Sequence, residues 1–358
     1  MSGTDMDTAA AQLLIQPSAT VQDAMAVIDA GGRGIALLVN EQQQFIRTIT
    51  DGDLRRAILA GHAVNTRLEA ALAIEGARST TAPVNTPRDE QLSIMLRAQV
   101  RHLPLLRPDG TVADLSVAEH VPDDQLPLQA VIMAGGFGTR LRPLTDDTPK
   151  PMLPVGGRPL MERTIEGLQR AGVSRINVTT HYMPEKIIQH FGGGQKFGVE
   201  LNYVSEEQPL GTAGALRLIS EVDEPLLVMN GDILTNIDYR SLLRFHREHQ
   251  AKLTVALRQY EMQVPYGVVE AKDGVVSELR EKPRISFLVN AGIYLLEPSV
   301  LQYIPDEGRY DMTDLINRLL KQGETVVGFP VMEYWLDIGR LDDFQKAQED
   351  VNRVRWAA

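Results

Sequence analysis

Cysteine is absent from the 358 residues, which excludes disulfide bonds and thiolate chemistry. No stretch approaches the roughly 18 consecutive apolar residues of a membrane-spanning helix. The first residues, MSGTDMDTAAAQ, are polar and acidic and lack the basic segment that begins a secretion signal. We therefore expect a cytoplasmic protein that does not bind membranes.

Positive charge is also scarce. The chain has 36 Lys and Arg against 47 Asp and Glu, a formal net charge of −11. This balance argues against a nucleic-acid partner, so any phosphate site must be a local basic pocket. No lysine precedes Lys150, which fits a chain of two parts. The segment VPDDQLPLQ, residues 121–129, reads as a short linker. We predict one module over residues 1–124 and a larger domain over residues 125–358.

The N-terminal part contains a weak internal repeat, in which similar patterns return after about 67 residues. Each copy reads as helix, strand, turn, strand and helix. The first copy comprises residues 21–29, 35–39, 45–50 and 53–60, and the second comprises residues 89–98, 103–107 and 111–121. Neither copy alone would bury enough apolar surface to be stable, so the two copies should pack together.

This repeat resembles a tandem CBS-domain pair, a small α+β module that often binds adenine nucleotides in a regulatory role. The best match is ITDGDLRRAI, residues 49–58. In that family a Thr and an Asp three residues later hold ribose and phosphate, which implies Thr50 and Asp53 here. The second copy has Val117 and His120 at these places, so only the first half-site keeps its polar contacts. A domain that binds no ligand and serves packing or oligomerisation is the alternative.

The strongest signal begins with the apolar run LQAVIMA, residues 128–134, which is typical of a buried parallel strand. The run GGFGTRLRPLTDDTPKPMLP follows at once, and its glycines would let backbone N–H groups approach a polyphosphate. Arg140 and Arg142 can offer forked donors to phosphate, and Lys150 is a cation stiffened by a proline on each side. The spacing matches neither a Walker A loop nor a dinucleotide-binding turn.

This stretch resembles the signature of the sugar-phosphate nucleotidylyltransferases, and the resemblance runs from about Leu128 to the C-terminus. It implies that the NTP phosphates are bound by the strand end and the glycine loop, residues Ala134, Gly135, Gly136, Gly138 and Thr139. It also implies catalytic roles for Arg140 and for Lys150, which would contact the α-phosphate.

Two further segments each carry an aspartate after an apolar run. PLLVMNGDIL, residues 225–234, ends in Gly231 and Asp232, and EYWLDIGRLDDF, residues 333–344, supplies Asp337. Ligands of open α/β sheets gather at the carboxyl ends of strands, and Mg²⁺ prefers carboxylate and phosphate oxygens. A single aspartate here is often only a turn former or helix cap. The resemblance implies that Asp232, which is also catalytic, and Asp337 jointly bind Mg²⁺.

The remaining motifs resemble the base and sugar sides of the family's site. In EEQPLGTAGALRL, residues 206–218, Gln208, Gly211 and Thr212 would contact the nucleotide, although Thr212 could serve only as a helix cap. Gly267, Glu281, Lys282 and Asn290 would bind the sugar phosphate. For Glu281 and Lys282 the alternative is a solvated charge pair. His181 lies near the site in family register, and we expect a structural role for it.

The alternation of strand and helix patterns predicts an α/β, Rossmann-like mixed sheet of the nucleotide-diphospho-sugar transferase type, preceded by the small α+β CBS pair. The expected strands are residues 129–134, 175–180, 199–204 and 225–230, and the expected helices are residues 158–171, 184–191, 212–220, 238–248 and 340–352. A more antiparallel region is expected over residues 252–257, 266–271 and 276–281.

The resemblance implies transfer of a nucleotidyl group from an NTP to a sugar 1-phosphate, giving an NDP-sugar and pyrophosphate for cell-surface glycan precursors. A CBS pair fused to such a transferase resembles bacterial guanylyltransferase-like proteins, which favours GTP and leaves UTP, CTP and dTTP open. The alternatives are an inactive nucleotide-sensing or scaffold protein, and a transferase that acts on a phosphoalcohol. The EKP, NAGIY and DIG elements favour a sugar. We expect a homo-oligomer.

Overall fold

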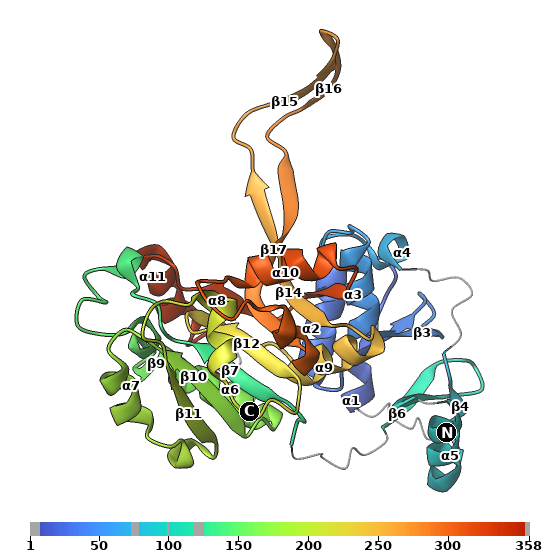
Figure 1. Cartoon of the computed structure of the whole chain (residues 1–358). Coiled ribbons are helices and arrows are strands. Elements are labelled where there is room, and N and C mark those ends of the chain that lie inside the picture. The colour runs from blue at the N-terminus through green and yellow to red at the C-terminus, as the bar shows by residue number, and fades with distance from the viewer. Residues whose placement is uncertain (1–7, 73–78, 99, 118–124, 355–358) are drawn as a thin grey trace. The chain divides into compact units, whose positions relative to one another are not determined.

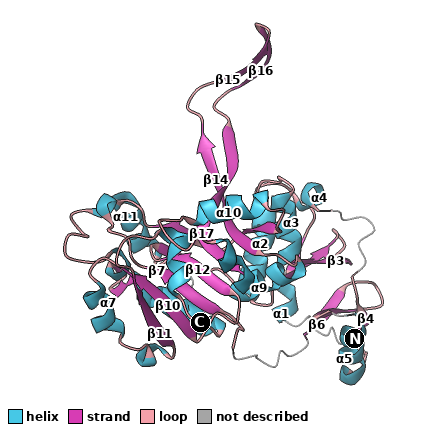
Figure 2. Ribbon diagram, in the orientation of Figure 1, coloured by secondary structure: helices cyan, strands magenta, loops and turns pink. Residues whose placement is uncertain are grey.

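The computed structural model describes residues 8–72, 79–98, 100–117 and 125–354. The chain divides into two compact units, Met1–Val121 and Pro122–Ala358. None of the helices in the described ranges is both long and apolar enough to cross a bilayer. Figures 1 and 2 show the elements of both units.

The N-terminal unit is built from two copies of one topology. In each copy, a short strand pairs in parallel with a second strand, and this strand pairs antiparallel with a third. The first copy contains α1 (Thr8–Ala11), β1 (Leu14–Ile15), α2 (Val21–Gly31), β2 (Ile35–Val39), β3 (Phe45–Thr50), α3 (Asp51–Leu59) and α4 (Leu68–Ala71). The second contains β4 (Ala82–Pro83), α5 (Arg88–Ala98), β5 (His102–Leu106) and β6 (Val112–Val117).

The predicted repeat is confirmed by this duplication. Strands β2 and β5 begin 67 residues apart, at Ile35 and His102, and the register irregularity between Leu38 and Val39 returns between Leu105 and Leu106. The helix expected at the end of the second copy, with His120, lies outside the described residues. The copies share one apolar cluster, in which Leu37 and Val39 meet Val112 and Leu115.

The C-terminal unit contains a seven-stranded mixed sheet in the order β11-β10-β7-β12-β17-β14-β18. Only β17 runs antiparallel to its neighbours. The strands are β7 (Gln129–Met133), β10 (Arg175–Thr180), β11 (Glu200–Ser205), β12 (Leu226–Asn230), β14 (Leu253–Gln263), β17 (Arg284–Leu296) and β18 (Val326–Pro330). This arrangement confirms the predicted α/β mixed sheet.

Helices cover both faces of this sheet because the strand residues alternate between two apolar clusters. Ala130 and Ile132 of β7 belong to the cluster with α6 (Leu160–Ala171), α7 (Pro184–Phe191) and α9 (Tyr239–Glu248). Val131 faces the other cluster, with α8 (Gly211–Gly214), the 3-10 helices η4 (Ala215–Leu218) and η5 (Pro298–Tyr303), and α10 (Met312–Lys321). The helix expected over residues 212–220 is shorter than predicted, because α8 ends at Gly214 and the chain continues as the 3-10 helix η4.

A third apolar cluster holds the long loop after β7 in place. It joins Leu141, Leu153 and Val155 of this region to Leu234 and Ile338. The short elements in this part of the unit are η1 (Thr139–Leu141), η2 (Lys150–Met152), β8 (Pro154–Val155), β9 (Arg158–Pro159), β13 (Ile233–Thr235), β19 (Trp335–Asp337) and α11 (Leu341–Asp350). The 3-10 helix η3 (Gln195–Phe197) lies elsewhere in the unit. This cluster sets the positions of the loop side chains.

A long β-arm extends from the sheet. Strands β14 and β17 pair from the core outward, and β15 (Val268–Lys272) and β16 (Val275–Arg280) form its outer hairpin. The buried parts are short, because β14 is buried only at Leu253–Ala256 and β17 only from residue 291 onward. Figure 1 shows the hairpin projecting away from the body of its own unit. The antiparallel region is confirmed, but β14 continues beyond the expected end at residue 257 to Gln263, and β17 was not among the predicted strands.

Candidate active site

The candidate site lies where the strand order of the large sheet reverses. From β7 the chain continues to β10 and β11 on one side, and it then returns to place β12 on the other side of β7. Met133 and Asn230, the last residues of β7 and β12, lie opposite each other. The crevice at such a switch point is the usual ligand site of an open α/β sheet. It places the glycine loop beside Asp232.

Two aspartates from distant segments meet here. Strand β13 pairs antiparallel with β19 and sets Ile233 opposite Asp337, and the Ile338 N–H donates to the Asp232 carbonyl at 3.0 Å. Partial burial and the neighbouring charge of Asp232 raise the pKa of the Asp337 carboxyl, while Lys150 and Arg140 oppose this rise. Two carboxylates and two cations therefore share one electrostatic environment.

Lys150 is held directly on Asp232. Its ammonium group donates to Asp232 Oδ2, and the two side chains are only 11% and 21% exposed. Asp232 Oδ1 is buried and accepts no hydrogen bond from the described residues. A buried carboxylate oxygen without a partner is costly and calls for an explanation, such as a bound cation.

Glycines allow this close approach. A Cβ on Gly231 would lie 2.6 Å from the Met133 carbonyl oxygen, so only glycine lets Asp232 follow β12 so near to β7. Gly138 has φ 62°, and a Cβ there would lie 2.9 Å from Thr145 Cγ2 and 3.3 Å from the Cβ of Lys150. Gly136 has open space around it. The glycine loop is thus closely packed where Gly138 meets Lys150, and it has free space beside Gly136.

The two arginines of the loop lie differently. Arg140, in η1, is exposed and reaches the rim of the aspartate pair, since a Cβ on Gly339 would lie 3.8 Å from Arg140 Nη1 and 3.6 Å from Asp337 Oδ1. Arg142 pairs with Asp146 at 3.3 Å, and both side chains are more than half exposed. The structure therefore brings Arg140 to the site and leaves Arg142 in a surface ion pair.

The segment that is predicted to contact the nucleotide base lies next to the glycine loop. A Cβ on Gly135 would lie 2.9 Å from Glu206 Oε1, and His181 Nδ1 donates to the Glu206 carbonyl at 2.8 Å. The ring of Phe137 packs edge-on against His181, with 5.4 Å between the centroids. His181 thus contacts the glycine loop through Phe137 and the loop after β11 through Glu206. The exposed Gln208 follows two residues after Glu206.

Gly211 and Thr212 contact the start of α10. The Thr212 hydroxyl accepts from Met312 N at 2.8 Å, and a Cβ on Gly211 would lie 2.6 Å from Asp311 Oδ1. Thr212 is not the cap of α8, because Leu210 occupies that position. The alternative of a simple N-cap is therefore wrong, and the hydroxyl serves to join α8 to α10.

A pocket of about 150 Å³ opens beside Asp337. The side chains and backbone that form it include Asn230, Ile233, Asn290, Tyr294, Trp335 and Asp337. The predicted sugar contact Asn290 is thus beside a predicted metal ligand. Asn230 and Trp335 were not predicted, although each lies within two residues of a predicted aspartate, and that proximity was the available signal.

Three predicted sugar-phosphate residues lie elsewhere. Gly267, Glu281 and Lys282 are exposed residues of the arm, and a Cβ on Gly267 would lie 3.0 Å from Glu281 Oε2. The described pocket lining contains neither Glu281 nor Lys282. The structure brings Gly267 and Glu281 together, but it does not bring them to Asp232 and Asp337 of the same chain.

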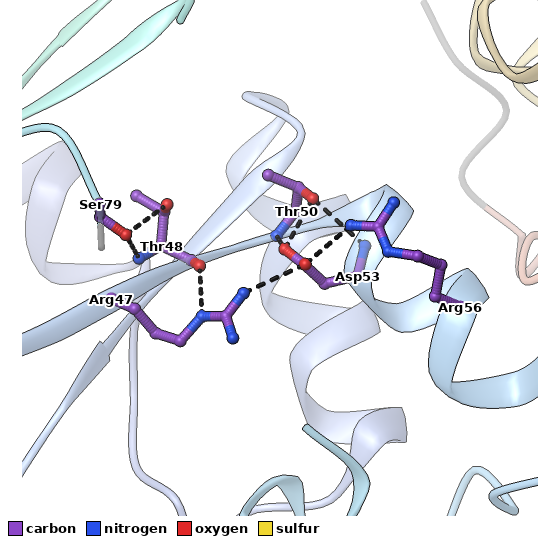
Figure 3. Close-up of polar contacts among 6 residues, drawn as sticks. All are labelled: Arg47, Thr48, Thr50, Asp53, Arg56 and Ser79. Carbon is purple, nitrogen blue, oxygen red and sulfur yellow. Dashed lines mark hydrogen bonds and ion pairs between the residues drawn. The ribbon is translucent and has the colours of Figure 1, made fainter. Parts of the chain in front are cut away.

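The candidate nucleotide contacts of the N-terminal unit are engaged with each other (Figure 3). Thr50 is the N-cap of α3 and Asp53 completes its capping box, and Asp53 Oδ1 also accepts from Arg47 at 3.1 Å and from Arg56 at 2.9 Å. Burial alone would raise the pKa of Asp53, but the bonds from Thr50 and the two arginines outweigh it and lower the pKa. Thr20 and Asp23 form the same box at α2. The Thr and Asp therefore have a structural use that needs no ligand.

A sequence model described as "Nucleotidyl transferase" matches residues 129–354. The chain belongs to this family. The match covers the sheet and every residue of the switch-point site, and it leaves the N-terminal unit outside.

Known nucleotidyl transferases support the assignment. The chain is 34% identical over 227 residues to a mannose-1-phosphate guanyltransferase of Yarrowia lipolytica, covering 61% of this chain and 62% of the relative. It is 35% identical over 241 residues to a UTP–glucose-1-phosphate uridylyltransferase of Synechocystis, covering 62% of each. The chain thus spans about 62% of the length of these relatives. The crystal structure of HddC from Yersinia pseudotuberculosis has a TM-score of 0.51 and 27% identity, covering 62% of this chain and 99% of that one.

Two glycine variants separate the contribution of the glycine loop to folding from its predicted contact with a nucleotide. Gly138→Ala should destabilise the protein by about 1–3 kcal/mol, because alanine is strained at a left-handed φ and crowds Thr145. Gly136→Ala should leave the melting temperature unchanged and raise KM for the NTP by about tenfold, equivalent to one charge-assisted hydrogen bond. Thermal unfolding and initial rates measure both. An unchanged KM in the Gly136 variant would contradict close approach of phosphate to this loop.

Proposed function

We propose that the chain transfers a nucleotidyl group from an NTP to a sugar 1-phosphate, giving an NDP-sugar and pyrophosphate. The observation that carries this proposal is the cluster of Lys150, Asp232 and Asp337 beside a glycine loop at the switch point of the sheet. Phosphoryl and nucleotidyl transfer depend mainly on positioning and on neutralising crowded negative charge. The cluster offers fixed cations and carboxylates, which suit that task.

The reaction requires little proton transfer. An anionic oxygen of the sugar phosphate attacks the α-phosphorus of the NTP, and the bond from that phosphorus to the bridging oxygen of the β-phosphate breaks. Pyrophosphate carries away the electron pair. Lys150 and Arg140 stabilise the negative charge that develops on the α-phosphate and on the leaving group. No general base is needed, which agrees with the structural use of His181.

The residues present fit a divalent cation that arrives with the nucleotide. Asp232 Oδ1 is buried without a partner, and the charge of Asp232 helps to raise the pKa of Asp337. Within the described ranges, no three His, Cys, Asp or Glu side chains form a metal site by themselves. Mg²⁺ is commonly bound by one or two carboxylates together with substrate phosphates. When bound, Mg²⁺ would add positive charge on the NTP phosphates, with Asp232 and Asp337 as its protein ligands.

The choice of nucleobase is a separate proposal. We infer GTP as the first candidate because the fusion of a CBS-like pair to such a domain resembles guanylyltransferase-like proteins. A guanyl and a uridylyl transferase are nearly equally similar, at 34% and 35% identity, so similarity alone does not separate the bases. Gln208, Gly211 and the backbone around them would supply the base contacts.

A pyrophosphate-release assay tests this function. The four NTPs are combined with glucose-, mannose- and glucosamine-1-phosphate and with phosphocholine, each with and without Mg²⁺. Release that requires both a sugar 1-phosphate and an NTP supports the proposal. Release only with phosphocholine indicates a phosphoalcohol transferase. Absence of release from every pair, while NTP binding is retained, indicates an inactive nucleotide-sensing or scaffold protein.

We also propose that residues 1–124 form a CBS-like regulatory module for the catalytic domain of residues 125–358. The duplicated strand topology of β1–β3 and β4–β6 supports the module. Thr50 and Asp53 would have to exchange their present partners to bind an adenine nucleotide. Titration with AMP and with ATP, read by calorimetry and by the rate of pyrophosphate release, tests this role. An adenine nucleotide that neither binds nor changes the rate would contradict it.

A further inference from the structure

The β-arm exposes an unusual amount of apolar surface. Large apolar side chains that are more than half exposed are Tyr260, Tyr266, Val269, Val275, Val276 and Leu279. An isolated two-stranded hairpin is at best marginally stable in water, and soluble monomers rarely display large contiguous apolar patches. The arm therefore needs a surface to pack against.

The arm cannot use the pocket of its own chain while its base is paired. The β14–β17 ladder runs without a break from Leu257 opposite Asn290 to Gln263 opposite Arg284, and Val264 N then donates to the Pro283 carbonyl at 3.0 Å. Asn290 lines the pocket. Arg284 lies six positions further along the extended strand, a span of about 20 Å, and Lys282 lies beyond it. Reaching back would require the ladder to open.

The pocket lacks the charge that the arm carries. Its described lining contains no lysine or arginine. Of the nearby cations, Lys150 is already paired with Asp232, and Arg140 is the cation proposed for the NTP phosphates. A sugar phosphate needs at least one further cation there. Lys282 is exposed and has φ 45°, a left-handed conformation that is uncommon for a residue other than glycine. Glu281 lies beside it and across from Gly267.

We propose that the arm of one copy docks on the pocket of a second copy and supplies Lys282 and Glu281 to the sugar phosphate bound there. This inference rests on the proposed transferase function and identifies the partner of the same site. A second copy explains both features at once, because its pocket lacks a cation and the arm presents one among apolar side chains. Reciprocal exchange of arms closes a symmetric dimer and buries both arms.

Subunit complementation tests the shared site. Asp232→Asn removes the contribution of the pocket, and Lys282→Ala removes the contribution of the arm. Each substitution is made in a separate chain with its own tag, and hybrids of the two chains are purified through both tags. Sharing predicts that one of the two sites in a hybrid dimer is intact, so turnover at limiting sugar phosphate should recover to about half of the wild-type value. Hybrids as inactive as both parents would overturn the proposal, as would wild-type kinetics of the Lys282 variant.

A second measurement does not depend on activity. The chain has no cysteine, so a Lys282→Cys and Asn290→Cys double variant contains only the two introduced thiols. Docking between copies predicts disulfide-linked dimers on a non-reducing gel, and the matched control Lys321→Cys with Asn290→Cys should give none. If the disulfides form only within a chain, or if no disulfide forms, the proposal is overturned. An inactive wild type that still forms these dimers would contradict the transferase function while supporting arm exchange.

Discussion

Asp232→Asn should lower turnover by about 100-fold or more while the protein stays folded. The amide has nearly the same shape as the carboxylate, but it removes the charge that holds Lys150 and one of two proposed ligands for the cation. The effect should appear in kcat at saturating substrates, because the lost interaction supports the charge of the transition state.

The measurement is pyrophosphate release over a range of Mg²⁺ concentrations, with thermal unfolding as the check on folding. Asp306→Asn, in an exposed loop of the same unit, is the matched control and should behave as wild type. Wild-type turnover of the Asp232 variant at limiting Mg²⁺ would exclude both roles of this aspartate. A variant that loses turnover but regains it at high Mg²⁺ would support weakened cation binding as the cause.

Lys150→Met should lower kcat by roughly 100- to 1,000-fold, the range seen when one preorganised electrostatic donor is removed from a site. Its ammonium is nearly buried and lies on Asp232, so methionine keeps the apolar stem and removes only the charge. We expect a second and opposite effect in the absence of nucleotide. Without the competing ammonium, the pair Asp232 and Asp337 should bind Mg²⁺ more tightly.

Steady-state kinetics and calorimetry with Mg²⁺ alone measure these two effects. Lys186→Met is the matched control. Lys186 lies exposed on α7, and its ammonium donates to the carbonyl of Asp147, which belongs to the loop that carries Lys150. Lys150→Arg should recover part of the turnover if charge is the essential property. Near wild-type turnover in Lys150→Met would remove this lysine from the mechanism.

Local patterns were sufficient for the elements that carry the site. The run 129–133 is apolar at each central position and forms β7, and the glycines that follow form the loop as expected. The 67-residue repeat of the N-terminal unit was also readable, because each copy repeats the same order of helix and strand. These features depend on near neighbours in the chain, whose periodicity the sequence displays.

Other features depend on contacts between distant segments. The helix predicted over residues 212–220 ends at Gly214 and continues as η4, and its Thr212 bonds to Met312, one hundred residues away. The resemblance implies a ligand role for the polar pair Thr50 and Asp53, and in the structure the two side chains cap α3 and meet Arg47 and Arg56. A polar motif alone cannot indicate whether its hydrogen-bonding capacity is already used within the fold.

By itself, the sequence determined the α/β class, the glycine loop and the residue types of a phosphate site, because these follow from local periodicity and from the chemistry of single side chains. Only the tertiary structure decided that Asp232 and Asp337 meet, since the β13–β19 register joins segments about a hundred residues apart. It also decided that Lys282 leaves its own pocket along the β-arm. Strand pairing sets such long-range positions, and its register depends on the whole sheet.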